Sequence, residues 1–522
     1  MKHLRIGTFV TLLAAGVVTQ TLCERADAGP AAAPTTPISE FQQGDVVVAV
    51  EGDGAVPNDP SAGTGTPYGD NSASPLTLYQ YNVTGTASAS PAGYLALPQT
   101  QSGANLPISG EYGSSSEGNL ELSGNGQYLT IAGYGITAST FNANPVSFGG
   151  ATKTCLPTNA QCFPLAQTAS VTGTPSSSQA ITAGDTSSTA IVVPRVVAVI
   201  GANGSVDTST VLTSIFNENN PRSVYSPDGK ALYVSGEGQS TDNTGGVFYT
   251  TKGSTAVPTS ITGSDGGGIL SQDTREVQIY NNTLYVSSDS KTPNTPDRDF
   301  LGTLGTAGTP PTTLANGGAG PTQLPGFGTG TTGDITITAQ TTNGINSSGQ
   351  TVNLSPNSFF FANPTTLYVA DGGQPKNSGG DSSKPGDGGL QKWTFNGTSW
   401  VLDYTISAGL GLVANTASDG TTGLYGLTGE VIGGNVELFA TNFVLGDLDQ
   451  TYLYGITDVL SNTTNPDISN PNAEAFTELA AAPADTDFKG VSMAPAPEPA
   501  SMALLATGLA GLGVFRRRRV ND

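Results

Sequence analysis

The stretch PRSVYSPDGKALYVSGEG, residues Pro221 to Gly238, predicts a β-hairpin. Arg222 to Ser226 and Ala231 to Ser235 are short strands rich in residues that favour a pleated sheet. Pro227-Asp228-Gly229 between them is a tight turn, in which proline presets φ, aspartate can bond its own backbone and glycine accepts a positive φ. Since a lone hairpin is marginally stable in water, we expect it to belong to a larger sheet.

Imperfect copies of this hairpin recur along the chain. The copies are NLELSGNGQYLTIAGY (Asn119 to Tyr134), REVQIYNNTLYVS (Arg275 to Ser287), SFFFANPTTLYVADGG (Ser358 to Gly373) and LYGLTGEVIGGNVELFATNF (Leu424 to Phe443). Further strands follow them at Val196 to Ile200, Ser205 to Val211, Gly246 to Thr251, Leu390 to Phe395, Ser399 to Ile406 and Tyr452 to Thr457. Repeats of a few tens of residues with four strands each predict the blades of an all-β propeller.

The two ends of the repeat region predict how the ring closes. Phe488 to Pro495 matches the first strand of the unit and then stops, whereas Gly44 to Gly52 matches the second strand and has no first strand before it. One blade would therefore be shared by both ends of a single propeller spanning residues 44–495, which removes the open sheet edges. This count gives six blades, or seven if Leu301 to Thr342 hides a degenerate one.

The wording SPDGK-x-LYVS resembles the repeat of the YVTN/lactonase-like propeller family, over Pro221 to Gly238. Binding scaffolds and enzymes share such repeats. The resemblance therefore supports the fold and does not define an activity.

The N-terminus predicts export. Residues 1–28 combine basic residues, an apolar run and Ala26-Asp27-Ala28, which is the pattern of a cleaved secretory signal. Cys23 raises the alternative of a lipoprotein, but Gln20-Thr21-Leu22 places a large residue where that cleavage needs a small one. Residues 29–43 follow as a Pro/Ala/Thr-rich linker.

The C-terminus, residues 496–522, carries the most specific signal in the chain. Pro497-Glu498-Pro499 precedes the mainly apolar stretch Ala500 to Phe515, for which we expect one transmembrane helix. A basic cluster follows, composed of Arg516, Arg517, Arg518 and Arg519. Positive charge after an apolar helix holds that end in the cytoplasm, and arginine side chains can snorkel to extend a short span.

This order of motif, helix and arginine cluster resembles the PEP-CTERM sorting tail of exported Gram-negative bacterial proteins. The resemblance implies export across the inner membrane, recognition and cleavage near Pro497-Glu498-Pro499 by an exosortase-like membrane protease, and release to the surface, matrix or medium. Hosts of such proteins often make exopolysaccharide, which makes a polysaccharide or an envelope protein a candidate partner. The alternative is an ordinary membrane anchor that is not processed.

Composition excludes several classes of function. The chain has 19 basic and 41 acidic residues, a net charge of −22 that repels phosphate backbones, so we expect no nucleic-acid partner. Its one histidine, His3, leaves with the signal. The mature chain therefore cannot build a Ser-His-Asp triad or a histidine-ligated metal site.

Two groups of side chains invite a structural or metal-binding interpretation. Cys155 and Cys162, six residues apart in an exported protein, predict a loop-stapling disulfide, whereas a redox or metal pair lacks a CxxC spacing and a third ligand. Oxygen ligands for Ca²⁺ are present at Asp53, Asp59 and Asp70 and at Asp371, Asp381 and Asp387. Neither acidic group has a known Ca²⁺-loop spacing, and we favour solvated turn residues and no cofactor.

Two functions from different classes follow. The first, which we favour, is a noncatalytic surface or matrix propeller that binds a polysaccharide or protein through loops on its faces, with Trp393 and Trp400 serving as core packing rather than a sugar platform. The alternative is a lactonase-like hydrolase that uses carboxylates or Ca²⁺ in the central channel. That enzyme requires acidic side chains from several blades to converge on the axis.

Overall fold

The structure, a computed structural model, describes residues 30–53, 69–148, 153–155, 160–171, 191–238, 242–263, 273–289, 300–327, 335–337, 341–342, 345–346, 350–352, 354–373, 388–414, 417–464 and 474–497. The secretory signal and the apolar segment of the tail lie outside these residues, and the transmembrane helix stays a prediction. Within the described part of the chain, no helix is both long and apolar enough to cross a bilayer.

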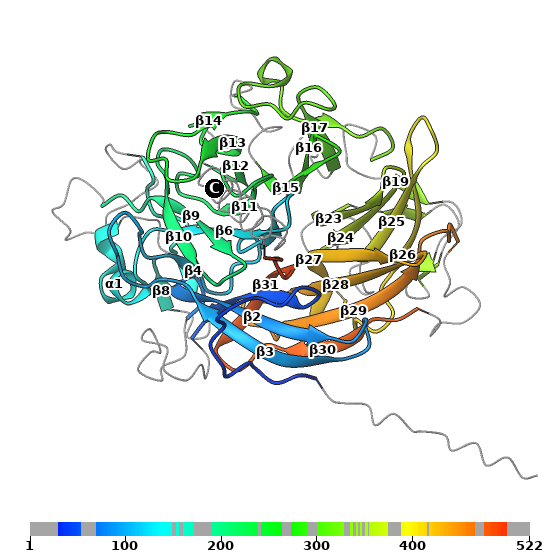
Figure 1. Ribbon diagram of the computed structural model, residues 1–522, viewed down its shortest axis with the longest axis horizontal. Coiled ribbons are helices and arrows are strands. Elements are labelled where there is room, and N and C mark those ends of the chain that lie inside the picture. The colour runs from blue at the N-terminus through cyan, green and yellow to red at the C-terminus, as the bar shows by residue number, and fades with distance from the viewer. Residues whose placement is uncertain are drawn as a thin grey trace, which may run out of the picture.

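The chain forms an all-β propeller, in which antiparallel sheets stand around a central axis (Figure 1). Four of these sheets have four strands each, in chain order from the axis outward. Their strands are β11 (Pro221–Tyr225), β12 (Ala231–Gly236), β13 (Gly246–Thr251) and β14 (Thr259–Ser260); β15 (Thr274–Tyr280), β16 (Thr283–Ser288), β17 (Phe300–Leu304) and β18 (Thr322–Gln323); β23 (Pro356–Asn363), β24 (Thr366–Asp371), β25 (Gly389–Phe395) and β26 (Trp400–Ile406); and β27 (Thr421–Ile432), β28 (Asn435–Val444), β29 (Tyr452–Val459) and β30 (Thr477–Ala481).

The remaining large sheet has nine strands and joins the two ends of the chain. It contains two four-stranded runs, β31-β1-β2-β3 and β5-β6-β9-β10, which β4 connects by pairing with both β2 and β6. The strands are β1 (Val46–Gly52), β2 (Ala73–Val83), β3 (Ala89–Ala96), β4 (Ser109–Glu111), β5 (Glu121–Leu122), β6 (Tyr128–Tyr134), β9 (Arg195–Gly201), β10 (Val206–Leu212) and β31 (Thr486–Met493).

Closure of the ring follows the predicted pairing of the termini. β1 and β31 are antiparallel neighbours, with Val46 opposite Met493, Val48 opposite Val491 and Val50 opposite Phe488. Phe488 packs edge-on against Tyr79 and Tyr81 of β2, which anchors the C-terminal strand in the sheet of the N-terminal one. The prediction that both termini share one sheet is confirmed.

Excursions within and between the sheets hold the remaining elements. These are α1 (Ala138–Ala143), η1 (Pro145–Phe148), η2 (Asn316–Gly318) and the two-stranded pairs β7 (Lys153–Cys155) with β8 (Ala160–Cys162), β19 (Ile335–Ile337) with β22 (Gln350–Val352), and β20 (Thr341–Thr342) with β21 (Ile345–Asn346). The region suspected of hiding a seventh blade begins with β17 and β18, which complete the sheet of β15 and β16, and continues into these short pairs.

The predicted linker is docked on the ring rather than free. Ala31 bonds the carbonyl of Leu479, Ile38 bonds that of Tyr94, and the Phe41 side chain is buried. Residues 30–43 therefore pack against the sheets that hold the two ends of the chain. Although the segment is rich in proline and alanine, its other amides can donate hydrogen bonds and its apolar side chains can be buried.

The turn of the repeat has the chemistry that its sequence predicts. Gly229 has φ of 75°, and a Cβ there would meet the ring of Tyr128 at 2.5 Å. Asp228 Oδ1 accepts hydrogen bonds from the amides of Lys230 and Ala231 at 2.8 and 2.9 Å. The backbone thus needs glycine at one position and a short acceptor side chain at the one before it.

Neighbouring sheets are joined by a recurring hydroxyl contact. Ser287 of β16 donates to the carbonyl of Asn357 in β23 at 2.8 Å, and Thr441 of β28 donates to that of Lys489 in β31 at 2.6 Å. Ser235 of β12 bonds the carbonyl of Arg275 in the same way. The hydroxyl side chain at the last position of the LYVS repeat thus hydrogen-bonds the inner strand of the next sheet. Buried aliphatic side chains between the sheets add to this contact.

The inner strands β5, β11, β15, β23, β27 and β31 run in the same direction, so the ring has two distinct faces. We call the end at which they begin the charged face, because Arg222, Arg275 and Lys489 lie there near the starts of β11, β15 and β31. We call the other end the exit face, where the turns after these strands lie. There the Ala496 amide bonds the carbonyl of Gly126 in the β5–β6 turn, and Pro497, the last described residue, is exposed.

Candidate functional site

Buried charged side chains converge at the charged face from several sheets. Arg222, Arg275 and Lys489 each stand two residues before a buried valine of an inner strand, namely Val224, Val277 and Val491. The repeat thus places a basic residue at the same level of three inner strands. An ion buried at this depth requires partners, because desolvation strongly disfavours an unpaired charge.

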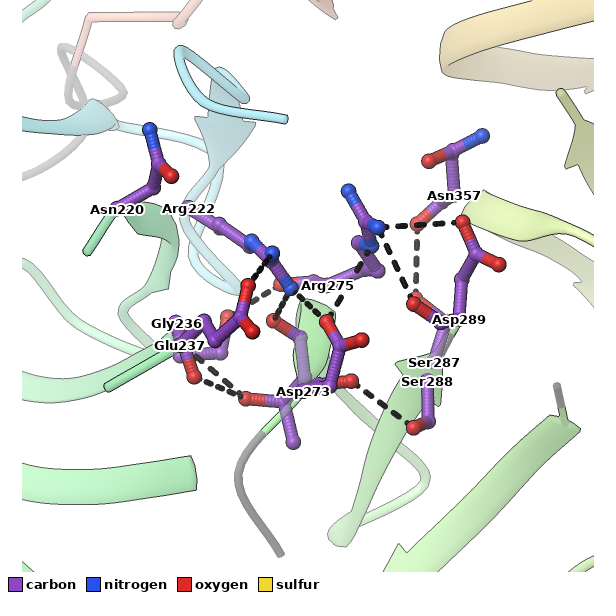
Figure 2. A network of polar contacts seen from close by, with 12 residues as sticks. Asn220, Arg222, Gly236, Glu237, Asp273, Arg275, Ser287, Ser288, Asp289 and Asn357 are labelled. Atoms are coloured by element: carbon purple, nitrogen blue, oxygen red, sulfur yellow. Dashed lines mark hydrogen bonds and ion pairs between the residues drawn. The ribbon is translucent and has the colours of Figure 1, made fainter. Parts of the chain in front are cut away.

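Arg222 is bound by two carboxylates from different segments. Its Nη2 lies 2.6 Å from Glu237 Oε2, after β12, and its Nη1 pairs with Asp273, before β15. Burial alone would lower the pKa of Arg222, but the two carboxylates raise it above its ordinary value. This ion-pair cluster joins the second and first strands of neighbouring sheets (Figure 2).

Arg275 extends the cluster to the next sheet. Its Nη2 contacts Asp289 Oδ2 at 3.2 Å and donates to the Asp289 carbonyl at 3.1 Å, and Ser355 donates to the same carboxylate at 3.2 Å. The Arg275 Nη1 group and the Asn357 side-chain oxygen are both buried and have no hydrogen-bond partner among the described residues. In Figure 2 the free guanidinium nitrogen of Arg275 points away from Asp289. Among the described residues, a donor group of Arg275 and an acceptor of Asn357 therefore remain unused beside the axis.

Lys489 is the cation of the closing sheet. Its Nζ pairs with Asp487, lies 3.6 Å from Glu51 Oε2 and donates to the Ser114 carbonyl at 2.6 Å. Burial by itself would lower the pKa of Lys489. The charges of Asp487 and Glu51 more than offset this and raise the pKa above its ordinary value, so the amine is charged. Glu51 is fully buried and both its oxygens lack a hydrogen bond among the described residues. Burial raises the pKa of Glu51 well above its usual range, and Lys489 opposes this only in part.

Glu117 completes the polar circuit around the face. Its Oε2 accepts hydrogen bonds from the Tyr134 hydroxyl at 2.6 Å and from Asn220 at 2.9 Å, and the Tyr425 hydroxyl donates to its carbonyl at 2.7 Å. Burial raises the pKa of the Glu117 carboxyl group above its ordinary value, and the hydrogen bonds from Tyr134 and Asn220 offset part of this rise. The residue bridges β6, the segment before β11 and β27, and so ties distant parts of the ring together.

Two further buried carboxyl groups, those of Glu121 and Glu276, lie on the inner strands. Glu121 of β5 accepts a hydrogen bond from Ser223 of β11 at 3.2 Å, and Glu276 of β15 accepts one from the Phe359 amide of β23 at 3.1 Å. Burial raises the pKa of Glu276 to about 8. Burial and then the charge of Glu276 raise the pKa of Glu121 well above its usual range. Such carboxyl groups can hold a proton at neutral pH and can serve as acids.

The Ca²⁺ candidates are only partly described. Asp371 is fully buried and accepts hydrogen bonds from the amides of Ser355 and Gly373 at 2.9 and 2.8 Å and from Gln391 at 2.9 Å. The interpretation of Asp371 as a solvated turn residue is therefore wrong, because its carboxylate fixes the ends of neighbouring strands. Asp70 is also buried and Asp53 is half-buried. Asp59, Asp381 and Asp387 lie outside the described residues. In the part of the chain that the structure describes, no three His, Cys, Asp or Glu side chains gather as a metal site.

The cysteine and tryptophan expectations have different outcomes. The backbone of β7 and β8 places Cys155 opposite Ala160 and Cys162 opposite Lys153, and the disulfide stays a prediction. Trp393 is buried and stacks on Phe327 with ring centroids 4.0 Å apart, and Trp400 packs edge-on against Phe361. Both tryptophans belong to the core, as predicted.

Sequence reasoning missed the basic residues of the charged face. The signal was present, since PRSV, TREV and DFKGV each carry a basic residue two positions before the valine of an inner strand. When the repeats are aligned by their turns, the apolar positions stand out, and the recurring basic position before the valine is not revealed. The carboxylate partners Glu237, Asp273 and Asp289 flank the strands, where acidic residues are ordinary turn formers.

A family model of the PEP-CTERM protein-sorting motif matches residues 495–519. The chain thus carries this sorting motif at its C-terminus, as its sequence predicts. The motif implies export, processing by an exosortase membrane protease, and transient anchoring in a membrane before release. Among curated proteins, no significant match was found.

Solved structures with related arrangements are distant. The chain is similar to a periplasmic gluconolactonase of Pseudomonas aeruginosa, with 11% identity over 83% of each chain and a TM-score of 0.35. It is also similar to a GH43 beta-1,3-galactosidase, with 7% identity over 82% of this chain and 59% of the other and a TM-score of 0.27. Apo AztD from Citrobacter koseri shares 9% identity over 86% of this chain and 98% of its own, with a TM-score of 0.22.

Proposed function

We propose that this protein is an exported, noncatalytic binding propeller of the cell surface or extracellular matrix of a Gram-negative bacterium. Its six blades are the four four-stranded sheets and the two runs of the nine-stranded sheet. The sorting motif supports the destination. The unused polar groups of Arg275 and Asn357 at the charged face support the binding role.

The ligand class that suits these groups is a polysaccharide that carries carboxylates. Arg275 offers free N–H donors and a positive charge, and Asn357 offers a carbonyl acceptor, which together match a uronic acid with its carboxylate and hydroxyl groups. Lys489 and Arg222 lie at the same face, and each is paired with two acidic side chains.

The test compares the secreted protein with a conservative variant. Arg275→Lys keeps the charge and loses the forked donors, so we expect binding to an acidic exopolysaccharide or to polygalacturonate on a glycan array to weaken at least about tenfold. Thr322→Ala, on the outer strand β18, is the matched control and should bind as the parent does. Absence of binding by the unmodified protein to any acidic glycan would rule this ligand class out.

A hydrolase is the second candidate, and the Glu121 and Glu276 pair is the observation that favours it. Two carboxyl groups from different blades, at least one of them protonated at neutral pH, are the groups required for acid and base catalysis of glycosyl or ester cleavage. In this case Glu276→Gln would abolish turnover while the fold is kept. A Ca²⁺-dependent reaction would also stop in the presence of chelator, and unchanged turnover under both treatments would remove this candidate.

Processing of the chain is a separate proposal. We infer that the signal ends near residue 28 and that a protease of the exosortase type cuts near Pro497, Glu498 and Pro499, with the cluster Arg516 to Arg519 held in the cytoplasm. Mass spectrometry of the secreted protein gives both ends. Alkylation before and after reduction tests the Cys155–Cys162 disulfide, because both cysteines gain the mass of the alkylating group only once the bond has been reduced.

A further inference from the structure

The tail leaves the ring at a fixed point of the exit face. After β31 the Ala494 amide bonds the carbonyl of Asp45 at 2.8 Å, and the Ala496 amide bonds that of Gly126 at 2.8 Å. Pro495, the first residue of the matched motif, is buried, and Pro497 is exposed. The sorting motif therefore begins inside the folded ring, and the free part of the chain starts at Pro497.

The tether between the ring and the apolar segment is short. By sequence only Pro497, Glu498 and Pro499 separate Ala496 from Ala500, where the apolar segment begins. Three extended residues span at most about 10 Å. Once the apolar segment is inserted, the exit face is held within about this distance of the bilayer, which leaves the charged face directed away from it.

One inner hairpin reaches further from the exit face than the inner hairpins of three other sheets. β27 and β28 have 12 and 10 residues, whereas the inner hairpins of the sheets β11–β14, β15–β18 and β23–β26 have 5 to 8 residues per strand. Leu438 comes four positions after Gly434, whereas the matching Leu284 comes two positions after Asn282. Two extra residues in each strand extend the hairpin by about 7 Å.

The tip of this hairpin is apolar and exposed. Val431 and Ile432 are 44% and 47% exposed, and Val459, on the neighbouring strand β29, is 38% exposed. Ile432 is opposite Asn435, which is opposite Val459, so Ile432 and Val459 lie on one face of the sheet with β28 between them, and Val431 lies on the other face at the same end. Gly433 and Gly434 close the turn with positive φ angles of 58° and 94°. No atom lies within 4 Å of the position that a Cβ would take at either glycine.

The apolar tip lies at the same face as the point where the tail leaves, one sheet away from it. Its sheet is the neighbour of the closing sheet, as shown by Thr441 of β28 bonding Lys489 of β31 and by Thr457 of β29 bonding Thr86 in the β2–β3 turn. Two independent features, the short tether and the projecting apolar tip, therefore share one side of the ring. Val257 and Leu314 are exposed singly elsewhere on the ring, whereas three exposed apolar residues gather at the end of this sheet.

We propose that the tip of the β27–β28 hairpin, Val431-Ile432-Gly433-Gly434, inserts into the lipid interface while the sorting tail anchors the chain. The partner is the bilayer surface itself. Insertion of a few apolar side chains to the depth of the headgroups suits a reach of this size. The contact depends on the tail, because Glu430 and Glu437 stand directly opposite each other behind the tip and oppose adhesion to anionic lipid. The inference rests on the proposed membrane stage of the protein.

The test uses the full-length chain reconstituted in phosphatidylcholine vesicles that contain a brominated phosphatidylcholine, which quenches nearby tryptophan. We compare Ile432→Trp with Ile191→Trp, a residue that is 55% exposed and precedes β9 on the side of the charged face. The native Trp393 and Trp400 are buried and give both variants the same background. We expect the added tryptophan at 432 to be quenched several-fold more strongly than the one at 191.

The outcomes separate this inference from the proposed anchoring. If the chains float with the vesicles but both variants are quenched equally, the tip does not contact lipid, and the anchoring stands. If the chains do not float with the vesicles, the membrane stage and the contact are both wrong. Selective quenching at 432 that persists in high salt supports an apolar contact, whereas its loss on dilution of the protein would assign the tip to a second copy of the chain.

Discussion

The two faces of the ring are built from the same repeat and have opposite chemistry. At the charged face, side chains such as Arg222, Arg275 and Lys489 are buried and held by carboxylates from neighbouring segments. At the exit face, turns such as Pro227-Asp228-Gly229 satisfy themselves with local hydrogen bonds, and the longest hairpin ends in exposed apolar residues. The difference shows that buried ion pairs between segments hold the blades in register at one face, and we propose that this face also recognises the ligand while the other face serves the tail and its membrane stage.

The largest effect that tests this comparison is the loss of a buried cation. Lys489→Met leaves Asp487 and Glu51 without their counter-ion, and we expect it to reduce the free energy of unfolding by about 3–5 kcal/mol. Lys252→Met is the control at the β13–β14 turn, because its pair with Asp207 at 3.2 Å is one-third exposed and contributes about 0–1 kcal/mol. Urea unfolding at neutral pH measures both, and equal losses would contradict the distinction between the faces.

The pH dependence of stability comes next. The pKa of Glu276 is raised from 4.5 in the unfolded chain to about 8, so the folded state binds the extra proton between these values. The free energy of unfolding should therefore fall as pH rises from about 4.5 to about 8, by about 1.4 kcal/mol for each pKa unit involved.

Glu276→Gln supplies the control for this pH dependence. The variant keeps an acceptor for the Phe359 amide and cannot ionise, so it should be more stable than the parent above pH 8 and similar to it below pH 4.5. Urea midpoints measured across this range would contradict the assignment if the parent and the variant gave parallel curves.

A smaller effect tests the hydroxyl contacts between sheets. Ser287→Ala removes the donor to the Asn357 carbonyl and the acceptor of the Glu276 amide, and should lower stability by about 1–3 kcal/mol because both partners are buried. In β24 the repeat reads LYVA instead of LYVS, so Ala370 occupies the position that matches Ser287. Thermal unfolding of Ser287→Ala beside Ser288→Ala, whose hydroxyl bonds within its own sheet, measures the share due to the contact between sheets.

The smallest effect concerns the exposed hairpin tip. Ile432→Ser should change the free energy of unfolding by less than about 0.5 kcal/mol, because the side chain is nearly half exposed and makes no buried contact that the fold requires. Its unfolding midpoint should match that of the parent within error, while Leu438→Ser, a fully buried change in the paired strand β28, should prevent stable folding. A large loss at Ile432 would mean that the tip packs within the ring.

The hairpins and their closure could be predicted from sequence because their determinants are local. The Pro-Asp-Gly and Asn-Asn turns and the apolar strands around them recur in the printed chain, and the half-units at both ends indicated which strands must meet. The candidate site was less predictable. Arg222 and Asp273 are 51 residues apart in sequence, and their pairing depends on how adjacent blades are set.

The acidic candidates show the same limit. Asp371 was identified as a possible oxygen ligand from composition alone, whereas the fold uses it to accept amides from Ser355 and Gly373. Glu121 and Glu276 were not singled out, since an acidic residue in an alternating strand is ordinary until both faces of that strand are known to be covered.

The sequence by itself determined the strand pairs, the closing of the ring and the sorting motif, because turn chemistry, alternation and a contiguous C-terminal signal are properties of neighbouring residues. Only the tertiary structure decided which charges are buried together and that the tail and the apolar hairpin leave by the same face. Those outcomes depend on the direction and spacing of blades far apart in the chain, and burial then sets the electrostatic cost of every charge between them.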